Sequence, residues 1–388
     1  MAANALPRRA RTAVTAVFFV NGAVFSSLFA RLPAIKADLG LDDGELGVAL
    51  LFATIGLLIA QVAAGALAVR YGSRAVMRTV APLYCAAVAL PALAPTGEAF
   101  ALGLLVLGGA NGALDVAMNV QGAAVEARYD RPVMSSLHAA FSFGALTGAG
   151  AGALLAAGEV APDAHLAGVA AVTVVAVAVA TRGLLAPEPP DERRAAPMLA
   201  RPSRRLAALG ALAFCVLLAE GSVADWSAIY LRESIGSSQA IAAVGLAAFS
   251  LTMGVGRLAG DRIAVAVGPP TLAFVGALLA AVGLAAALAV QRPGSAIAGF
   301  AAMGLGLAAV FPLVVSAAAN RPDVAPGPAI AAVSTTGYAG FMAGPPLIGL
   351  LSELGTLRAA LLLPVLLCLA AAVLSPAVRR LPVRAGAG

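Results

Sequence analysis

The sequence contains little charge, and this decides its class. Only 11% of the 388 residues are charged and 61% are hydrophobic, whereas a soluble domain carries about 25% charged residues. A soluble globular fold is therefore excluded, and a membrane protein with many spans is expected. The formal net charge of +6 does not indicate a nucleic-acid partner, because the arginines are dispersed between apolar segments.

Cysteine and histidine are also scarce. Cys85, Cys215 and Cys368 lie far apart in apolar runs, and neither His138 nor His165 belongs to a metal-ligand spacing. This excludes a disulfide framework and a zinc site, so the cysteines are expected to be free core residues. No cofactor or metal is predicted. His165 stands in a short polar stretch and is expected to be solvated.

Catalytic and nucleotide-binding motifs are missing as well. The chain has no HExxH, no phosphate-binding GxxxxGK[ST] and no GxSxG. An enzyme is not expected, and a chain that moves solutes would use a gradient instead of hydrolysing ATP. An intramembrane protease built on Asp115 and Asp225 lacks the Gly-x-Gly-Asp motif expected around one of its acids.

Long apolar runs are what the sequence does have. Each is long enough to cross about 30 Å of hydrocarbon, and each is continuously apolar, which predicts helices and not barrel strands. The first run exceeds the apolar region of a signal peptide and is interpreted as a retained span. The twelve predicted spans are 12–31, 46–69, 75–94, 99–125, 133–157, 164–185, 206–231, 239–260, 264–290, 295–319, 328–351 and 357–377.

Arginine placement predicts the orientation. With the N-terminus in the cytoplasm, most of the 25 Lys and Arg residues fall on the cytoplasmic side, among them Arg8, Arg9, Arg128 and Arg380. The other side keeps Arg31, Lys36, Arg232, Arg292 and Arg358. Both termini are therefore predicted to be cytoplasmic, in a bacterial inner membrane, and the chain is expected to act as a monomer.

The sequence also repeats itself in two halves. A polar, proline- and arginine-rich stretch at 186–205 predicts a linker between six-helix bundles at 1–185 and 206–388. The run GALAVRYGSR that starts at Gly65 is matched by GRLAGDR, and Gly144 and Gly148 are matched by Gly340 and Gly344. Duplicated bundles around a central site are typical of secondary transporters. The small residues indicate either packing within a bundle or a sliding surface between bundles.

Three acids fall within predicted spans: Asp115, Glu220 and Asp225. A charge at the bilayer centre costs about 3 kcal/mol, so such residues usually face a cavity, a partner or a proton. At 100° per residue, Asn111, Asp115, Asn119, Gly122 and Glu126 share one face of their helix. This stripe predicts a hydrated path. The alternative is an Asp115 held by Asn111 and Asn119 that only fixes helix packing.

Other candidates carry alternatives too. Trp226 is either an interfacial anchor or an aromatic face for a sugar-like ligand. His138 is either a proton relay or a hydrogen-bonding residue. Asp225 is a candidate partner for Arg31 in an outer gate.

These features resemble the major facilitator superfamily, through the twelve spans, the central linker and the run from Gly65 to Arg74. The resemblance implies gating roles for Arg70 and Arg74, although Val69 replaces a usual aspartate, and for Arg257, Asp261 and Arg262. LDVAMN, ending at Asn119, resembles a fucose-permease motif and implies that Asp115 is the essential membrane acid. Phe29 stands where those permeases carry a second acid. MNVQGAAVE and AEGSVADW are similar to bacterial relatives with unassigned substrates.

The sequence thus predicts an all-α membrane protein of two pseudo-symmetric six-helix bundles. The expected function is movement of a small solute by alternating access, coupled to protons, with a sugar-like compound as the candidate solute. The alternatives are a proton-antiport exporter and a non-transporting receptor or scaffold. The predicted substrate or proton site comprises Asn21, Asp115, Asn119, His138, Glu220, Asp225, Trp226 and Tyr338, and the predicted gating residues are Arg31, Arg70, Arg74, Arg257, Asp261 and Arg262.

Overall fold

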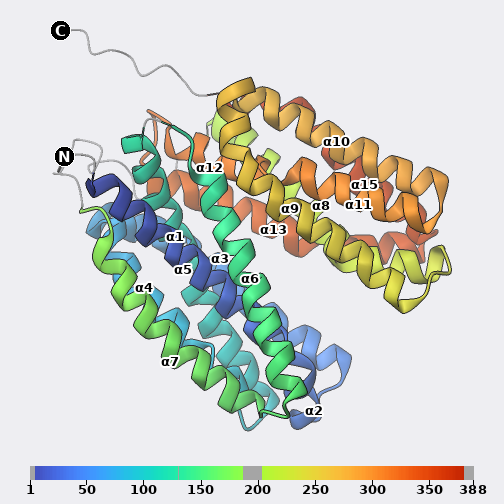
Figure 1. Ribbon diagram of the computed structural model, residues 1–388, viewed down its shortest axis with the longest axis horizontal. Coiled ribbons are helices and arrows are strands. Elements are labelled where there is room, and N and C mark those ends of the chain that lie inside the picture. The colour runs from blue at the N-terminus through green and yellow to red at the C-terminus, as the bar shows by residue number, and fades with distance from the viewer. Residues whose placement is uncertain (1–4, 130, 187–202, 380–388) are drawn as a thin grey trace. The chain divides into compact units, whose positions relative to one another are not determined.

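A computed structural model describes residues 5–129, 131–186 and 203–379 (Figure 1). Helices account for every regular element within these ranges, and the described residues include no strand. The all-α prediction is therefore confirmed. Most of the predicted linker at 186–205, together with Arg380, lies outside the described residues.

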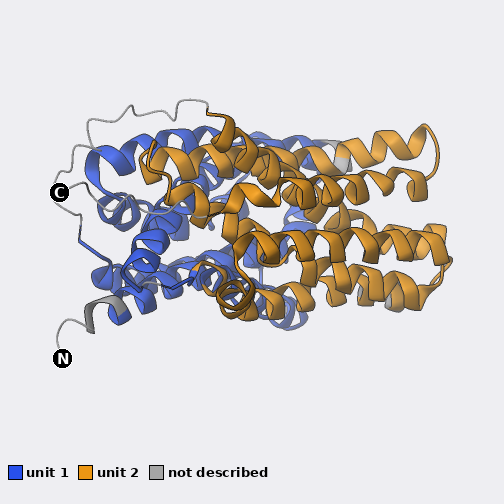
Figure 2. Cartoon of the chain, turned by 90° about the horizontal axis from the view of Figure 1, so that it is seen from above, with its two compact units in different colours: residues 1–133, 137–200 blue, residues 134–136, 201–388 orange. Residues whose placement is uncertain are grey.

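The chain forms two compact units, one comprising residues 1–133 and 137–200 and the other residues 134–136 and 201–388 (Figure 2). The first unit contains most of α6 (Met134–Ala157), whose first turn is grouped with the second unit. Its other elements are α1 (Ala5–Phe29), α2 (Leu32–Leu39), α3 (Asp43–Tyr71), α4 (Ser73–Ala87), the 3-10 turn η2 (Pro91–Leu93), α5 (Gly97–Tyr129), α7 (Pro162–Ala180) and the 3-10 turn η3 (Thr181–Gly183).

The second unit repeats this helical organisation. Its elements are α8 (Arg204–Ile229), the π-helical turn η5 (Tyr230–Ser234), α9 (Gln239–Val267), α10 (Pro269–Val290), α11 (Pro293–Leu307), α12 (Val310–Ala319), α13 (Pro326–Glu353), α14 (Leu357–Ala360), α15 (Leu362–Leu374) and the 3-10 turn η6 (Ser375–Val378).

Proline explains two interruptions within predicted spans. A proline lacks the N–H that would bond four residues back, and its ring clashes with that carbonyl. Pro312 breaks the helix between α11 and α12, and Pro364 breaks it between α14 and α15. Both runs still cover the length of a span, so the predicted spans at 295–319 and 357–377 hold while their helices are discontinuous.

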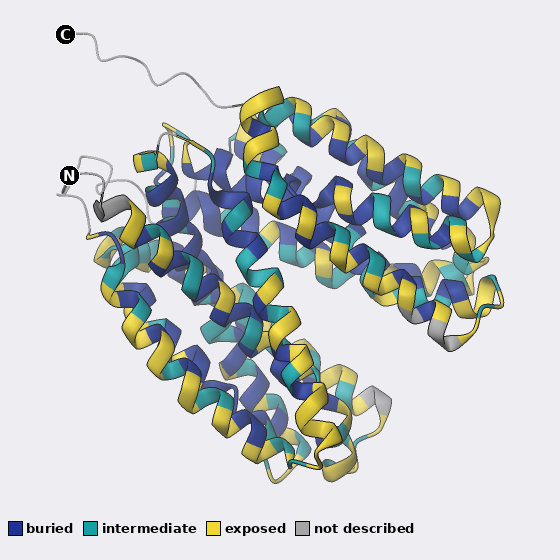
Figure 3. Cartoon of the chain, in the orientation of Figure 1, coloured by how far each residue is buried: buried dark blue, intermediate teal, exposed yellow. Residues whose placement is uncertain are grey.

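Ten helical runs of the described chain are long and apolar enough to cross a membrane. Two further helices, α9 with 29 residues and α13 with 28 residues, coincide with the predicted spans at 239–260 and 328–351. Large apolar side chains are exposed on several helices, for example Leu154 at 76% and Val373 at 78%. Figure 3 shows that exposed residues recur along the helices of each unit. Such faces suit hydrocarbon and would be unfavourable in water.

Glycines bring equivalent helices into contact in each unit. A Cβ on Gly144 or Gly148 of α6 would overlap the α1 carbonyl oxygens of Phe19 or Ala23. In the second unit a Cβ on Gly340 of α13 would lie 2.6 Å from the Phe214 carbonyl oxygen of α8. Small residues permit this backbone approach where lipid offers no hydrophobic driving force. The matched glycines therefore serve packing within each unit.

The structure also shows the environments of the cysteines and of His165. The three cysteines are free and buried, as predicted. The prediction for His165 was wrong, because the residue lies in α7 and is 3% exposed. The helix begins at Pro162, so that His165 falls within its first turn and the imidazole is turned inward.

Candidate functional site

The candidate site of the first unit is centred on Asp115 in α5. Close packing of α5 against α3 positions it: a Cβ on Gly108 would overlap the Ala53 carbonyl oxygen, and one on Gly112 would overlap that of Leu57. The same helix register brings Gln61 of α3 beside the aspartate. Gln61 Nε2 donates a hydrogen bond to Asp115 Oδ2 across 3.2 Å.

Asn119 extends this contact along α5. Its Nδ2 donates to the Asp115 main-chain oxygen across 2.8 Å and to Asp115 Oδ1 across 3.2 Å. His138 Nε2 lies 3.2 Å from Asn119 Oδ1. Because that amide oxygen only accepts, His138 must carry its proton on Nε2 to bond there. The His138 ring also meets Phe18 edge-on, with the ring centroids 5.2 Å apart.

A second polar contact joins α1 to α5. Asn21 Nδ2 donates to Asn111 Oδ1 across 3.0 Å, and the Tyr84 hydroxyl donates to the Asn21 main-chain oxygen across 3.3 Å. Four of the predicted site residues, Asn21, Asp115, Asn119 and His138, therefore lie in this one polar region.

Burial modifies the prediction of a hydrated path. Asp115 is 3% exposed and Asn119 is fully buried, so the carboxylate is closed off from bulk water in this conformation. Glu126 also differs from expectation. Its Oε2 accepts from the Val133 main-chain N–H at 2.9 Å, so it links α5 to the residue that precedes α6.

The second unit holds the other candidate acids. Glu220 of α8 lies 3.5 Å from Arg257 of α9, and these side chains are 17% and 10% exposed. Asp225 is exposed one turn further along α8. The buried indole N–H of Trp226 has no hydrogen-bond partner among the described residues. Tyr338 of α13 meets the Phe311 ring edge-on at a centroid distance of 6.2 Å.

Asp261 of α9 makes a helix cap. Its Oδ1 and Oδ2 accept from the main-chain N–H groups of Ser135 and Ser136, each at 2.9 Å, and Ser135 Oγ donates to the Arg257 carbonyl oxygen at 2.8 Å. The helix cap position is Val133, which offers no side-chain acceptor. Asp261 thus satisfies N–H groups that the first turn of α6 leaves open and complements the positive helix end.

The remaining gating candidates are distributed over both units. Arg31 is buried and donates to the Val160 carbonyl oxygen. Arg70 is exposed at the end of α3 and stacks on Tyr71, 5.3 Å from its ring centroid. Arg74 is half-buried in α4, and Arg262 is exposed on α9.

The sequence interpretation missed Gln61 and Ser135. Gln61 stands in a span that is otherwise almost wholly apolar, and such an isolated polar residue was a usable signal. Ser135 gave no signal, because its partners lie more than 120 residues away along the chain.

The membrane-spanning helices, their repetition in two units and the buried acid define a polytopic transport protein. The Major Facilitator Superfamily model matches residues 14–223 and 209–387. The chain belongs to this superfamily, and it is a membrane transporter, not an enzyme.

Individual relatives agree with this assignment. An uncharacterised MFS-type transporter of Yersinia pestis is 35% identical over 94% of each chain. A structure of the E. coli fucose:proton symporter FucP is similar with a TM-score of 0.77, 16% identity and coverage of 96% of this chain and 98% of FucP. The human organic anion transporter MFSD10 gives a TM-score of 0.73, with 18% identity, 95% of this chain and 99% of MFSD10 covered. The fold is thus fucose-permease-like.

Proposed function

We propose that the chain is a proton-coupled transporter that moves a small polar solute by alternating access, with Asp115 as the proton-carrying acid. The observation that carries the proposal is a buried carboxylate inside a membrane-spanning unit, held by the amides of Gln61 and Asn119. A buried charge in a span is costly, and a carboxylate there is a candidate for reversible protonation.

The proposed proton step uses this buried carboxylate. Asp115 takes one proton from one side of the membrane when its site opens there and releases that proton to the other side. Burying the neutral acid costs less free energy than burying the carboxylate. Asp115 is therefore expected to be protonated while its site is closed to both sides of the membrane. In the first unit, Asn21, Asn119 and His138 are proposed to donate or accept hydrogen bonds with a polar solute. Trp226 and Tyr338 remain proposed solute contacts of the second unit.

Two neighbours support proton coupling and a sugar-like solute. One is the fucose:proton symporter described above, and another is a proton:xylose symporter with a TM-score of 0.65 and 14% identity. These likenesses concern the fold, so the solute itself is part of the proposal. So are operation as a monomer, an inner-membrane location with cytoplasmic termini, and division into two six-helix halves around residues 186–205.

Gating is assigned to the hydrogen bonds of Asp261. In the present conformation they hold the first turn of α6 to α9, next to the Glu220–Arg257 pair. Separation of α6 from α9 at this point would break these bonds and leave two main-chain N–H groups without an acceptor. Opening of the proposed gate therefore costs free energy. Arg31, Arg70, Arg74 and Arg262 remain proposed gating residues.

The test uses the purified protein in liposomes with an imposed pH gradient and a panel of radiolabelled sugars, organic anions and drugs. Gradient-driven flux of one solute by the wild type, lost in Asp115→Asn and retained in Asp163→Asn, supports the proposal. Asp163 is an exposed acid in the first turn of α7 and so serves as a matched control. Solute flux in the same direction as the protons identifies a symporter. Solute flux in the opposite direction identifies a proton-antiport exporter. Equal gradient-driven flux by the wild type and Asp115→Asn would show that Asp115 takes no part in proton coupling.

A further inference from the structure

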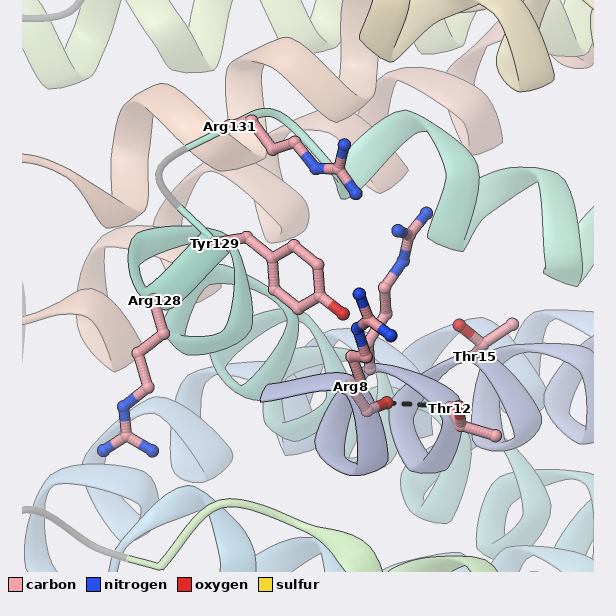
Figure 4. A pocket seen from close by; sticks show the side chains of 7 residues that line it. Arg8, Thr12, Thr15, Arg128, Tyr129 and Arg131 are labelled. Carbon is pink, nitrogen blue, oxygen red and sulfur yellow. Dashed lines mark hydrogen bonds between the residues drawn. The ribbon is translucent and has the colours of Figure 1, made fainter. Parts of the chain in front are cut away.

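A second site lies in the first unit, apart from Asp115. A hollow of about 710 Å³ is lined by residues from the start of α1 and the end of α5, together with Arg131 (Figure 4). By the predicted topology this is the cytoplasmic end of both helices. Its lining consists of Arg8, Arg11, Thr12, Thr15, Arg128, Tyr129 and Arg131.

Tyr129 organises the cationic groups of this hollow. The Arg11 guanidinium carbon lies 5.5 Å from the Tyr129 ring centroid, and that of Arg131 lies 5.3 Å from it. Figure 4 shows the Tyr129 ring and the Arg131 side chain extending to the same side, whereas Arg128 points away from them. One aromatic ring thus holds two guanidinium groups from different parts of the chain beside the same hollow.

The α1 side of the hollow adds a further cation and two hydroxyls. Thr12 Oγ1 donates its one hydrogen to the Arg8 main-chain oxygen across 3.1 Å, so this hydroxyl has no hydrogen left for an anion. The Thr15 hydroxyl lies one turn further along α1, among the lining residues. Arginine guanidinium groups donate in a planar fork that matches phosphate oxygens, and the Tyr129 and Thr15 hydroxyls can each donate one further hydrogen bond.

We propose that this hollow binds a phosphate-bearing anion through Arg8, Arg11 and Arg131, with Tyr129 positioning the two guanidinium groups that flank it. General attraction to the cytoplasmic leaflet requires only dispersed surface arginines. Here the arginines gather around a hollow with hydroxyls, which is the arrangement expected of a specific oxyanion site. The site is independent of the proton-carrying role proposed for Asp115.

The same chemistry can be supplied by two sources. One is the headgroup of an anionic phospholipid in the cytoplasmic leaflet, and the other is a soluble phosphate. The experiment therefore titrates the full-length protein in detergent with phosphatidylglycerol, phosphatidylcholine or inorganic phosphate at constant ionic strength. The rise of the thermal unfolding midpoint with ligand concentration gives the apparent affinity in each titration.

The decisive variant is Arg8→Gln with Arg131→Gln. The charge-matched control is Arg182→Gln with Arg379→Gln, because both of these arginines are exposed, lie on the predicted cytoplasmic side and are not part of the lining. A guanidinium hydrogen bond to a charged phosphate contributes about tenfold to binding. We expect the decisive variant, which loses two lining arginines, to bind about 100-fold more weakly, and the control to bind as the wild type does because its arginines do not line the hollow.

Each outcome bears on the proposal. Phosphatidylglycerol binding that the decisive variant loses supports a lipid-headgroup site, and inorganic phosphate binding that it loses supports a soluble ligand. Equal weakening in both double variants would show that only general charge attraction operates, and would overturn the proposal. So would the absence of any shift with either anion. Unliganded unfolding midpoints establish that the decisive variant is folded.

Discussion

Gln61 on α3 donates its Nε2 hydrogen to Oδ2 of Asp115 on α5, and both side chains are buried. The Gln61 Oε1 atom has no hydrogen-bond partner among the described residues. A carboxylate accepts hydrogen bonds only, but a protonated carboxyl group also donates one. Rotation of the Gln61 amide would present Oε1 to that new donor. This one residue can therefore serve both protonation states of Asp115.

The first prediction concerns Gln61→Leu. Gln61 can bond Asp115 in either protonation state, but its hydrogen bond to the charged carboxylate is the stronger one, so removing the amide makes protonation easier. We expect the pH profile of uptake to move to higher pH by about one unit. His138, reached through Asn119, and Tyr84, reached through Asn21, are the titratable groups joined to this region by the hydrogen bonds described above. The measurement is initial uptake rate against pH in liposomes.

Gln121→Leu is the matched control for this change. Gln121 is also a buried glutamine, but its Nε2 donates to Ser73 Oγ and to the Leu185 carbonyl oxygen. It should lower stability without moving the pH profile. An unshifted profile in Gln61→Leu would show that this glutamine acts only in packing.

The second prediction separates the two roles considered for His138. The ring donates from Nε2 to Asn119 Oδ1, and a glutamine amide could replace that donor although it does not titrate. We expect His138→Gln to keep most of the uptake with an unchanged pH profile, and His138→Leu to lose about tenfold through the unsatisfied Asn119 oxygen. A proton relay would instead require both variants to lose coupling. Uptake driven by a pH gradient, compared with uptake driven by the solute gradient alone, distinguishes these results.

The third prediction tests the glycine contacts. Gly148→Ala forces a Cβ against the Ala23 carbonyl oxygen of α1, so α1 and α6 must separate. Such overpacking is expected to destabilise the protein by about 1–3 kcal/mol. Gly150→Ala is the control in the same helix, because a Cβ there meets nothing within 4 Å. Thermal unfolding in detergent should lower the midpoint for the first variant only. Equal midpoints would mean that the two helices already have room to move apart.

The fourth prediction concerns the cap made by Asp261. Asp261→Ala leaves the N–H groups of Ser135 and Ser136 without their acceptor, and this should cost about 1–3 kcal/mol. Hydrogen exchange at these two amides should speed up selectively. Arg262→Gln changes the neighbouring exposed residue and should leave them protected. Unchanged exchange in Asp261→Ala would argue that the start of α6 is held by other contacts.

Much of the fold could be predicted, because a membrane span has a long apolar signature. The predicted span at 133–157 ends with α6, at Ala157, and the span at 239–260 starts with α9, at Gln239. The interruptions that precede Pro312 and Pro364 were not predicted, although proline chemistry accounts for them.

The candidate site was less predictable. The spacing of Asp115 and Asn119 placed them on one face, but their partners Gln61 and His138 come from other helices, and only helix packing determines that register. The closed environment of Asp115 and the cap formed by Asp261 on α6 likewise arise from contacts between residues far apart in sequence.

The Glu220–Arg257 pair carries the last prediction. Both side chains are largely buried, so removing either partner leaves a poorly solvated charge, at a cost of about 3–5 kcal/mol. Replacing both by leucine removes the two charges together, and a buried pair exchanged for apolar residues is often neutral for stability. We therefore expect Glu220→Leu and Arg257→Leu each to lower the unfolding midpoint more than the double variant does. A purely structural pair would also leave the double variant active in transport. If stability returns but flux does not, the pair acts in the transport cycle, because packing has been restored and only the two charges are missing.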